Sequence, residues 1–231
     1  MTLEAPLPGN ECVIPTTLEL PLGTDALAAN ATVLGPGAVL LRGFALPAEQ
    51  LLHDVLDVTA QALFRHMLTP GGRRMSVAMS NCGDLGWVSD ARGYRYESHD
   101  PLSNQPWPKM PGSLADLAGR AAAVAGYPDF RPDACLINGY QAGTRLSLHQ
   151  DKDERDFSQP IVSVSLGLPA VFLWGGASRN ARPLRVTLAH GDVVVFGGAS
   201  RLTYHGVHEL DDGVHPELGA RRINLTFRAA R

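Results

Sequence analysis

The pattern of apolar and polar positions changes near residue 133, after which it predicts strands. Beyond this point the apolar runs are short and are separated by Gly, Pro, Asn and Asp, as in strands joined by turns. The predicted strands are residues 135–140, 145–149, 161–166, 170–174, 184–188, 192–196, 203–207 and 222–228. Eight short strands favour a jelly roll, so residues 133–231 are expected to form a double-stranded β-helix core.

Before residue 133 the pattern predicts two helices and a short strand at residues 39–41. The first helix opens at Pro47, which suits a first turn. Its apolar face is expected to consist of Leu51, Leu52, Val55, Leu56 and Leu63. The second helix is expected to begin with a capping box of Ser113 and Asp116 and to end at Gly126. The stretch between them, residues 70–112, is predicted to be irregular, and such a long loop is usually functional.

Composition and charge narrow the class of protein further. The 231 residues are 45% hydrophobic and 19% charged, which is typical of one folded domain. The formal charge of −3 is uneven, because the first 60 residues hold seven acids and one base and the rest is therefore mildly basic. Charge alone neither supports nor excludes a nucleic-acid partner. The three cysteines show no C-x-x-C spacing, and the sequence contains neither a secretory signal nor a run of about 18 apolar residues. These features predict a cytoplasmic protein without a membrane partner.

The candidate chemistry begins with His149 and Asp151, an H-x-D pair at the end of a predicted strand, and with His205 in a later strand. Side chains two residues apart on a strand share a face, so His149 and Asp151 can reach one metal ion. Two imidazoles and one carboxylate form a facial triad, which leaves three positions of an iron(II) ion open. The H-x-D spacing alone is a weak signal, and the strand setting of His205 strengthens it.

The last predicted strand, residues 222–228, alternates strictly. Its polar positions are Arg222, Asn224, Thr226 and Arg228. Taken alone, this alternation favours a polar face in water. Inside a closed jelly roll the same face would line the interior, where Arg222 and Arg228 would bind the two carboxylates of a diacid. Asn138 and Tyr140 share one face of an earlier strand and fit either hydrogen bonding to a bound acid or a structural role.

Nine sequence segments carry a resemblance to a known family. They are residues 69–72 (TPGG), 75–79 (MSVAM), 81–83 (NCG), 85–87 (LGW), 132–138 (PDACLIN), 146–154 (LSLHQDKDE), 161–167 (IVSVSLG), 190–195 (HGDVVV) and 224–228 (NLTFR). With them the chain resembles the AlkB family of iron(II)- and 2-oxoglutarate-dependent dioxygenases, which repair alkylated nucleobases. The resemblance spans residues 36–231. It implies a mainly β domain of the α+β type, with a jelly-roll core and an N-terminal helical and nucleotide-lid extension. Residues 1–35 lie before it and are rich in Pro, Thr, Gly and Ala, so they are expected to form an extended leader with little regular structure.

The resemblance also implies the ligands and their residues. One Fe(II) per chain would be held by His149, Asp151 and His205, with Arg228 near the metal-bound end of 2-oxoglutarate. The residues implied in binding this co-substrate are Asn138, Gly139, Tyr140, Arg222, Asn224 and Arg228. The reaction would couple 2-oxoglutarate and O2 to succinate, CO2 and an aldehyde, with release of formaldehyde from a methyl group.

The substrate implied by the resemblance is alkylated DNA, preferably single-stranded but also double-stranded, with RNA as a further substrate. Residues 70–112 would form the nucleotide lid, in which Trp87 stacks on the extruded base and Tyr94 and Tyr96 bracket the adjacent phosphate. Asp153 would accept hydrogen bonds from the exocyclic amino group of N1-methyladenine or N3-methylcytosine. Further substrate contacts are implied for Arg179, Met75 and Met79. Arginines 73, 74, 92 and 95 flank the lid, and we expect them to contact the DNA backbone.

Three other functions compete with this interpretation. The nearest is a 2-oxoglutarate-dependent hydroxylase of a small metabolite on the same fold, against which the aromatic lid and Asp153 argue. The second is a metal-binding jelly roll without oxygenase turnover, in which Arg222 and Arg228 would have no evident purpose. The third is a catalytically silent nucleic-acid-binding module, which the complete set of candidate ligands disfavours. The sequence contains no sign of an oligomer, so a monomer is expected.

Overall fold

The computed structural model describes residues 30–231, and residues 1–29 of the predicted leader lie outside the described residues. The last part of that leader differs from the expectation of little regular structure. Strand β1 (Ala31–Gly35) pairs antiparallel with β2 (Ala38–Leu41), and Gly37 at φ +74° turns the chain between them. The strand predicted at residues 39–41 is confirmed as β2.

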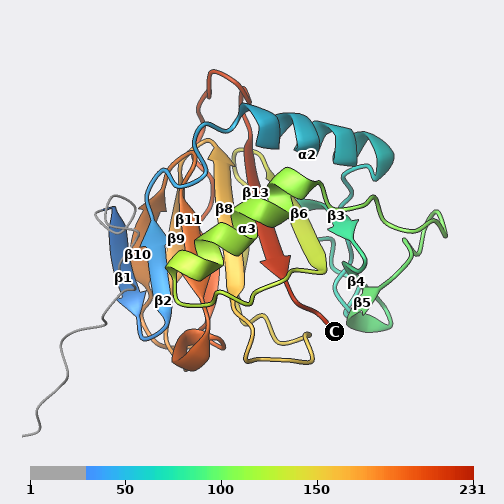
Figure 1. Cartoon of the computed structure of the whole chain (residues 1–231). Helices are drawn as coiled ribbons and strands as arrows, with labels where there is room; N and C mark the ends of the chain where they lie inside the picture. Colours follow the sequence, from blue (N-terminus) through green and yellow to red (C-terminus); the bar gives the residue numbers. More distant parts are fainter. Residues whose placement is uncertain (1–29) are drawn as a thin grey trace, which may run out of the picture.

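The larger of two main sheets has seven antiparallel strands in the order β1-β2-β11-β8-β13-β6-β3 (Figure 1). Its remaining strands are β3 (Ala78–Gly83), β6 (Ala134–Tyr140), β8 (Ile161–Gly167), β11 (Val193–Phe196) and β13 (Arg222–Arg228). The central position of β13 explains why all seven of its residues are buried. All six pairings between neighbouring strands of this sheet are antiparallel, as expected of a jelly roll.

The smaller sheet has the order β10-β9-β12-β7. Its strands are β7 (Leu146–His149), β9 (Ala170–Trp174), β10 (Leu184–Leu188) and β12 (His205–Val207). A buried apolar cluster joins the two sheets, because Phe172 and Trp174 of the smaller sheet pack with Leu40, Ile161 and Phe196 of the larger. All eight strands predicted beyond residue 133 are confirmed, and so is the mainly β jelly-roll fold.

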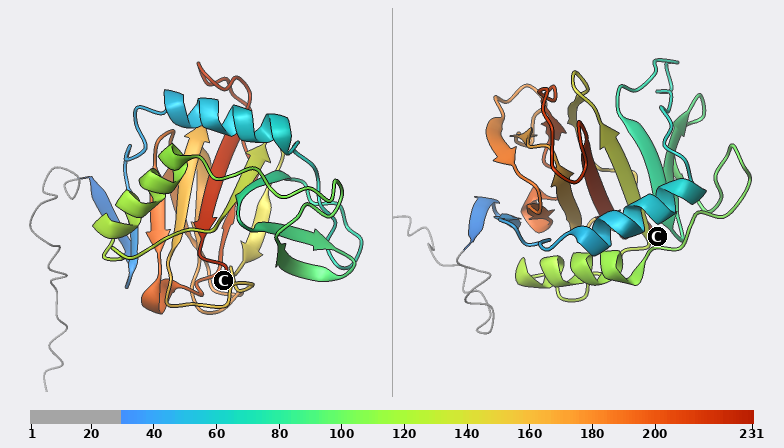
Figure 2. Two further views of the ribbon diagram at one scale, coloured as in Figure 1. Left: turned by 45° about the vertical axis from the view of Figure 1, so that its right-hand side comes forward. Right: turned by 90° about the horizontal axis from the view of Figure 1, so that it is seen from above.

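The two α-helices of the described residues, α2 (Glu49–Gln61) and α3 (Gly112–Val124), cover the outer face of the larger sheet (Figures 1 and 2). Their apolar residues share one core with Ile223, Leu225 and Phe227 of β13. The predicted face of the first helix was partly wrong. Leu56 is exposed, and Leu63 lies beyond the end of the helix and is exposed as well.

The predicted capping box of the second helix is also wrong. Helix α3 begins at Gly112 after Pro111, so Ser113 lies inside the first turn. Its hydroxyl donates a hydrogen bond to Asp54 of α2 and thereby joins the two helices. The predicted end is confirmed, because the helix stops at Val124 and Gly126 follows at φ +91°.

Residues 70–112 are more regular than predicted. They contain β3 and a separate hairpin of β4 (Gly86–Asp90) and β5 (Gly93–Glu97), which lies beside the larger sheet (Figure 2). Buried Trp107 anchors this hairpin, since its indole N–H donates to Glu97 O at 2.9 Å. A Cβ atom at Gly86 would lie 2.4 Å from the same ring, so only glycine fits there. Among residues 30–231, no helix is long and apolar enough to cross a membrane.

Candidate metal centre and active-site cavity

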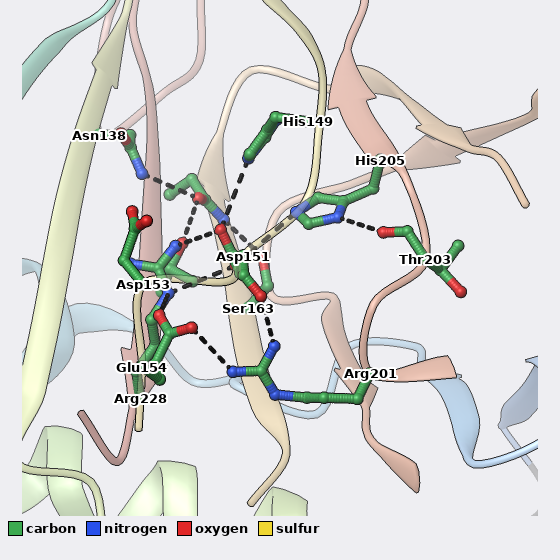
Figure 3. A network of polar contacts seen from close by, with 12 residues as sticks. Asn138, His149, Asp151, Asp153, Glu154, Ser163, Arg201, Thr203, His205 and Arg228 are labelled. Carbon is green, nitrogen blue, oxygen red and sulfur yellow. Dashed lines mark hydrogen bonds and ion pairs between the residues drawn. The ribbon is translucent and has the colours of Figure 1, made fainter. Parts of the chain in front are cut away.

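The three predicted metal ligands meet at the edge of the smaller sheet. His149 ends β7 and His205 begins β12, and the two residues are direct partners in the antiparallel pair. Asp151 follows two residues after His149, in the loop that leaves β7. One ligand atom from each of the three side chains lies within 4.8 Å of the other two, which is the spacing required to bind one metal ion (Figure 3).

Hydrogen bonds orient both imidazoles toward the metal position. The Nδ1 atom of His149 lies 2.9 Å from Ser147 O, and Nδ1 of His205 lies 3.0 Å from Thr203 O. A carbonyl oxygen can only accept, so Nδ1 carries the proton in each neutral ring. The Nε2 lone pairs are then free, and they face Asp151 at 3.7 and 3.8 Å.

Charge around Asp151 prepares it as a ligand. Burial raises the pKa of Asp151, but Arg228 and the two histidines outweigh it and hold the pKa well below its usual range. The guanidinium Nη2 of Arg228 lies 2.9 Å from Asp151 Oδ1. Burial, with the proximity of His149, lowers the pKa of His205 to about 4. At neutral pH the site therefore combines an ionised carboxylate with a neutral imidazole, the forms that bind metal.

A second polar site lies in the same cavity, around Arg222. This side chain is 1% exposed, and its Nη2 donates to Ser165 Oγ at 3.0 Å. Within the described residues, Nε and Nη1 of Arg222 have no partner, and neither does the hydroxyl of Tyr140. Burial of an uncompensated guanidinium costs several kcal/mol, so this arrangement calls for an anion. Three convergent donors fit the distal carboxylate of 2-oxoglutarate.

The polar face of β13 lines this cavity, so the prediction of a solvated face for the strand taken alone was wrong. Arg222, Asn224, Thr226 and Arg228 all contribute to a cavity of about 780 Å³ that also contains the triad. The reason is that helices cover the opposite face of the sheet and the smaller sheet closes the inner one. Arg228 is itself engaged by acids, because its Nε also lies 3.3 Å from Glu154 Oε1.

Three residues of β6 were predicted to bind the co-substrate, and two of them lie beside Arg222. Asn138 and Tyr140 line the cavity. Asn138 Nδ2 donates to Asn224 Oδ1 at 3.3 Å, and its Oδ1 finds no partner among residues 30–231. Gly139 alternates to the other face, where a Cβ atom would lie 3.1 Å from the ring of Phe64. It therefore makes no part of the cavity wall.

The hairpin β4–β5 forms a wall of the cavity next to the triad. Trp87 and Tyr94 lie in the cavity lining, with ring centroids 5.5 Å apart and planes tilted by 13°. The indole N–H of Trp87 donates to Asp153 Oδ2 at 2.7 Å. The predicted contacts Met75, Met79 and Arg179 also line the cavity. An aromatic face, a carboxylate and two thioethers thus line the same cavity as the triad.

Tyr96 points elsewhere than predicted. Its hydroxyl donates to Glu154 Oε1 at 2.6 Å, and burial raises its pKa well above the ordinary value. This orientation is inconsistent with a phosphate contact and leaves only Tyr94, which is half exposed, for that role. Glu154 and Arg201 were given no role from the sequence, although both are buried beside the triad. Glu154 lies in residues 146–154, one of the segments that carry the family resemblance. Arg201 lies in none of these segments, and no local sequence pattern indicates its role.

The four arginines expected along the lid divide into two pairs. Arg73 and Arg74 line the cavity and are exposed. Arg92 and Arg95 are instead bound to acids of their own hairpin, since both contact Asp90 and Arg95 also contacts Glu97 at 2.6 Å. The contact with the DNA backbone therefore stays a prediction for Arg73 and Arg74 alone.

A jelly roll with two histidines and one carboxylate at its inner edge, beside a buried anion site, defines a mononuclear iron oxygenase of the facial-triad class. The family model described as the 2OG-Fe(II) oxygenase superfamily matches residues 37–228. The alpha-ketoglutarate-dependent dioxygenase AlkB of Escherichia coli (strain K12) is 60% identical over 198 residues, which cover 85% of this chain and 92% of that protein.

Two further comparisons agree. The DNA N(6)-methyladenine demethylase ALKBH1A of Arabidopsis thaliana is 38% identical over 128 residues, or 54% of this chain and 37% of that protein. The solved structure of OsALKBH1 superposes with a TM-score of 0.75 at 30% identity and covers 86% of this chain and 99% of that one. The chain belongs to the AlkB family of the 2OG-Fe(II) oxygenases. Its metal is Fe(II), bound by His149, Asp151 and His205, and its co-substrate is 2-oxoglutarate.

Proposed function

We propose that the protein repairs N-alkylated bases in DNA, N1-methyladenine and N3-methylcytosine among them, by oxidative dealkylation. Single-stranded DNA is the preferred substrate, and RNA is a second one. The proposal rests on the lining of one cavity, which combines the metal-binding triad with a buried site for an anion and an aromatic wall. The Escherichia coli relative supports the oxygenase chemistry, and the Arabidopsis relative supports demethylation of DNA.

The bound iron and 2-oxoglutarate supply the oxidising chemistry, with O2 as oxidant and succinate, CO2 and an aldehyde as products. Arg222 and Tyr140 donate hydrogen bonds to the distal carboxylate of the co-substrate, and Ser165 holds the guanidinium in place. Arg228 keeps Asp151 ionised by pairing with it at 2.9 Å. Asp151, Arg222 and Arg228 are all buried, and removal from water strengthens these charge interactions.

Base recognition falls to the hairpin and to the loop after β7. The flat ring of Trp87 provides a stacking surface for an extruded base, and Asp153 lies within hydrogen-bond distance of its indole. A carboxylate favours lesions that are cationic and carry an exocyclic amino group, as N1-methyladenine and N3-methylcytosine do. Tyr94 is exposed enough to contact the neighbouring phosphate, while Met75 and Met79 offer adaptable apolar contacts.

The test is a paired assay of succinate and formaldehyde with a methylated trinucleotide. Wild-type protein with Fe(II), 2-oxoglutarate and O2 should form both products in similar amounts. A trinucleotide without the methyl group provides the control for uncoupled succinate formation. Succinate released without methyl loss from any N1-methyladenine or N3-methylcytosine oligonucleotide would instead favour the hydroxylation of a small metabolite.

Three further expectations remain predictions. The oxygenase domain is predicted over residues 36–231, and we infer that it also includes β1, because β1 pairs with β2 in the larger sheet. A cytoplasmic, reducing location is the second of these predictions. Sedimentation of the full chain would test the predicted monomer.

A further inference from the structure

Arg201 makes three hydrogen bonds in a buried position next to the metal centre. It follows the short 3-10 helix η1 (Gly198–Ser200) and is 3% exposed. Its Nη1 donates to Asp151 O at 2.7 Å and its Nη2 to Glu154 Oε2 at 2.9 Å (Figure 3). Its Nε donates to Gln159 O at 2.9 Å. These acceptors all lie in the segment that follows β7, so one planar guanidinium fixes three points of that segment.

The segment needs such support because it belongs to no sheet. Residues 150–160 contain no strand or helix, and Asp151 therefore has no ladder to hold its backbone. Arg201, by contrast, lies four residues before His205, close to the start of β12. The guanidinium consequently connects the chain segment of one metal ligand to the chain segment of another.

Glu154 extends the connection to the co-substrate side and to the hairpin. Glu154 is 6% exposed, and its carboxylate receives contacts from Arg201, Arg228 and Tyr96. Arg228 is shared between Glu154 and Asp151. Without Arg201, the buried charge of Glu154 would have Arg228 as its remaining cationic partner and would draw it away from Asp151.

We propose that Arg201 is a positioning residue that holds Asp151 in its metal-binding orientation relative to His149 and His205. It acts on Asp151 twice, directly through the main-chain carbonyl and indirectly by neutralising Glu154, which leaves Arg228 for the Asp151 carboxylate. The same carboxylate of Glu154 ties the hairpin to this unit through Tyr96. Substitution of a residue that orients metal ligands without touching the metal typically weakens metal binding by about 10- to 100-fold.

The experiment measures Mn(II) binding by the apoprotein of Arg201→Lys, with neither co-substrate nor nucleic acid present. Lysine keeps the positive charge but cannot make three bonds in one plane. Mn(II) should bind roughly 10- to 100-fold more weakly than to the wild type. The matched control is Arg185→Lys on the exposed face of β10, which should bind Mn(II) like the wild type. Thermal unfolding of each apoprotein separates positioning from stability.

A purely structural role predicts a different result, namely a lower Tm with unchanged Mn(II) affinity at temperatures well below unfolding. That result would overturn the proposal, and so would wild-type affinity with wild-type Tm. Should Arg201→Lys fail to fold, the double variant Arg201→Met with Glu154→Gln tests the direct contact, since it removes both buried charges together and with them the hydrogen bond to Asp151 O. Weaker Mn(II) binding by this double variant supports the proposal, and unchanged binding contradicts it.

A second measurement uses the loaded enzyme. Loss of positioning should raise the ratio of succinate to formaldehyde in Arg201→Lys, because co-substrate turnover then proceeds without productive contact with the base. The Mn(II) result does not depend on the identity of the substrate. A failure of the proposed repair activity can therefore be distinguished from a failure of the positioning role.

Discussion

His149 and His205 are direct partners across the antiparallel pair of β7 and β12, with ring centroids 4.4 Å apart. One strand register therefore sets the distance between two metal ligands that lie far apart in the sequence. A shift of this register by one residue would turn one imidazole to the opposite face of the sheet. Metal binding therefore depends on the register of β7 and β12 as well as on the identity of the ligands.

His149→Ala should abolish turnover and weaken Mn(II) binding by at least about 100-fold, because a ligand itself is lost. His149 is partly exposed, so the variant should still fold. Succinate formation and Mn(II) titration check both statements. His208→Ala, at an exposed position just beyond β12, should change neither quantity. Normal activity in the His149 variant would remove this residue from the site.

Arg222→Met should weaken 2-oxoglutarate binding by at least about 100-fold, since it removes two hydrogen bonds from a charged group, each worth about 1.5–3 kcal/mol. The same change should maintain or raise the Tm of the apoprotein, because it removes a buried guanidinium that has two unpaired nitrogens among the described residues. Binding is measured by titration and stability by thermal unfolding. A large loss of apoprotein stability would show that Arg222 serves the fold and not the co-substrate.

Asp153→Ala should reduce discrimination among damaged bases more than it affects metal binding. The ratio of kcat/KM for N1-methyladenine to that for N3-methylthymine, which has no exocyclic amino group, should fall by roughly tenfold. Asp153→Asn is the matched variant, because its amide oxygen still accepts the hydrogen bond from Trp87 but the negative charge is gone. Equal losses of Mn(II) affinity and of discrimination would mean that Asp153 supports the metal loop.

Arg73→Ala combined with Arg74→Ala should reduce the salt dependence of single-stranded DNA binding. Each phosphate contact contributes about 0.7 to the slope of log K against log salt, so the slope should fall by about 1.4. The control is the pair Arg120→Ala and Arg131→Ala, which are exposed on and just beyond α3. If the double variant bound single-stranded DNA with unchanged affinity and unchanged salt dependence, the proposed contact of Arg73 and Arg74 with the DNA backbone would be wrong.

His190 should make stability fall as the pH drops below about 6.5. Burial and then His215 lower its pKa, against the opposing effect of Glu217 and Glu49, so the unfolded chain binds the proton more readily. Its Nδ1 accepts the N–H of Gly167 at 2.9 Å, a bond that protonation destroys. The stability it contributes is complete above pH 6.5 and is lost as the pH falls toward the lowered pKa. Partial exposure keeps the loss below about 1 kcal/mol.

The check on His190 compares urea unfolding at pH 7.5 and pH 5.5. His190→Asn keeps an acceptor for Gly167 but does not titrate, so its free energy of unfolding should fall less between the two pH values than that of the wild type. An equal fall in both proteins would assign the acid sensitivity to other groups.

Much of the site could be predicted because its residues follow local rules. The sequence shows the candidate metal ligands directly, as an H-x-D pair and a later histidine. The strict alternation of residues 222–228 likewise identifies the polar side chains of the last strand. The strands beyond residue 133 were predictable for a similar reason, since period-two patterns and turn residues are local. The β4–β5 hairpin was missed because its strands are mainly polar and aromatic, and it depends on Trp107 for anchorage.

By itself the sequence determined the identity of the metal ligands, the strands that carry them and the donors for an anion. The tertiary structure alone decided that the polar face of β13 points inward, that Tyr96 turns to Glu154 and that Arg201 supports Asp151 from 50 residues away. The physical reason is that side-chain direction on a strand follows from backbone geometry, whereas the inner face of a sheet and the partner of a buried charge are set by segments that meet only on folding.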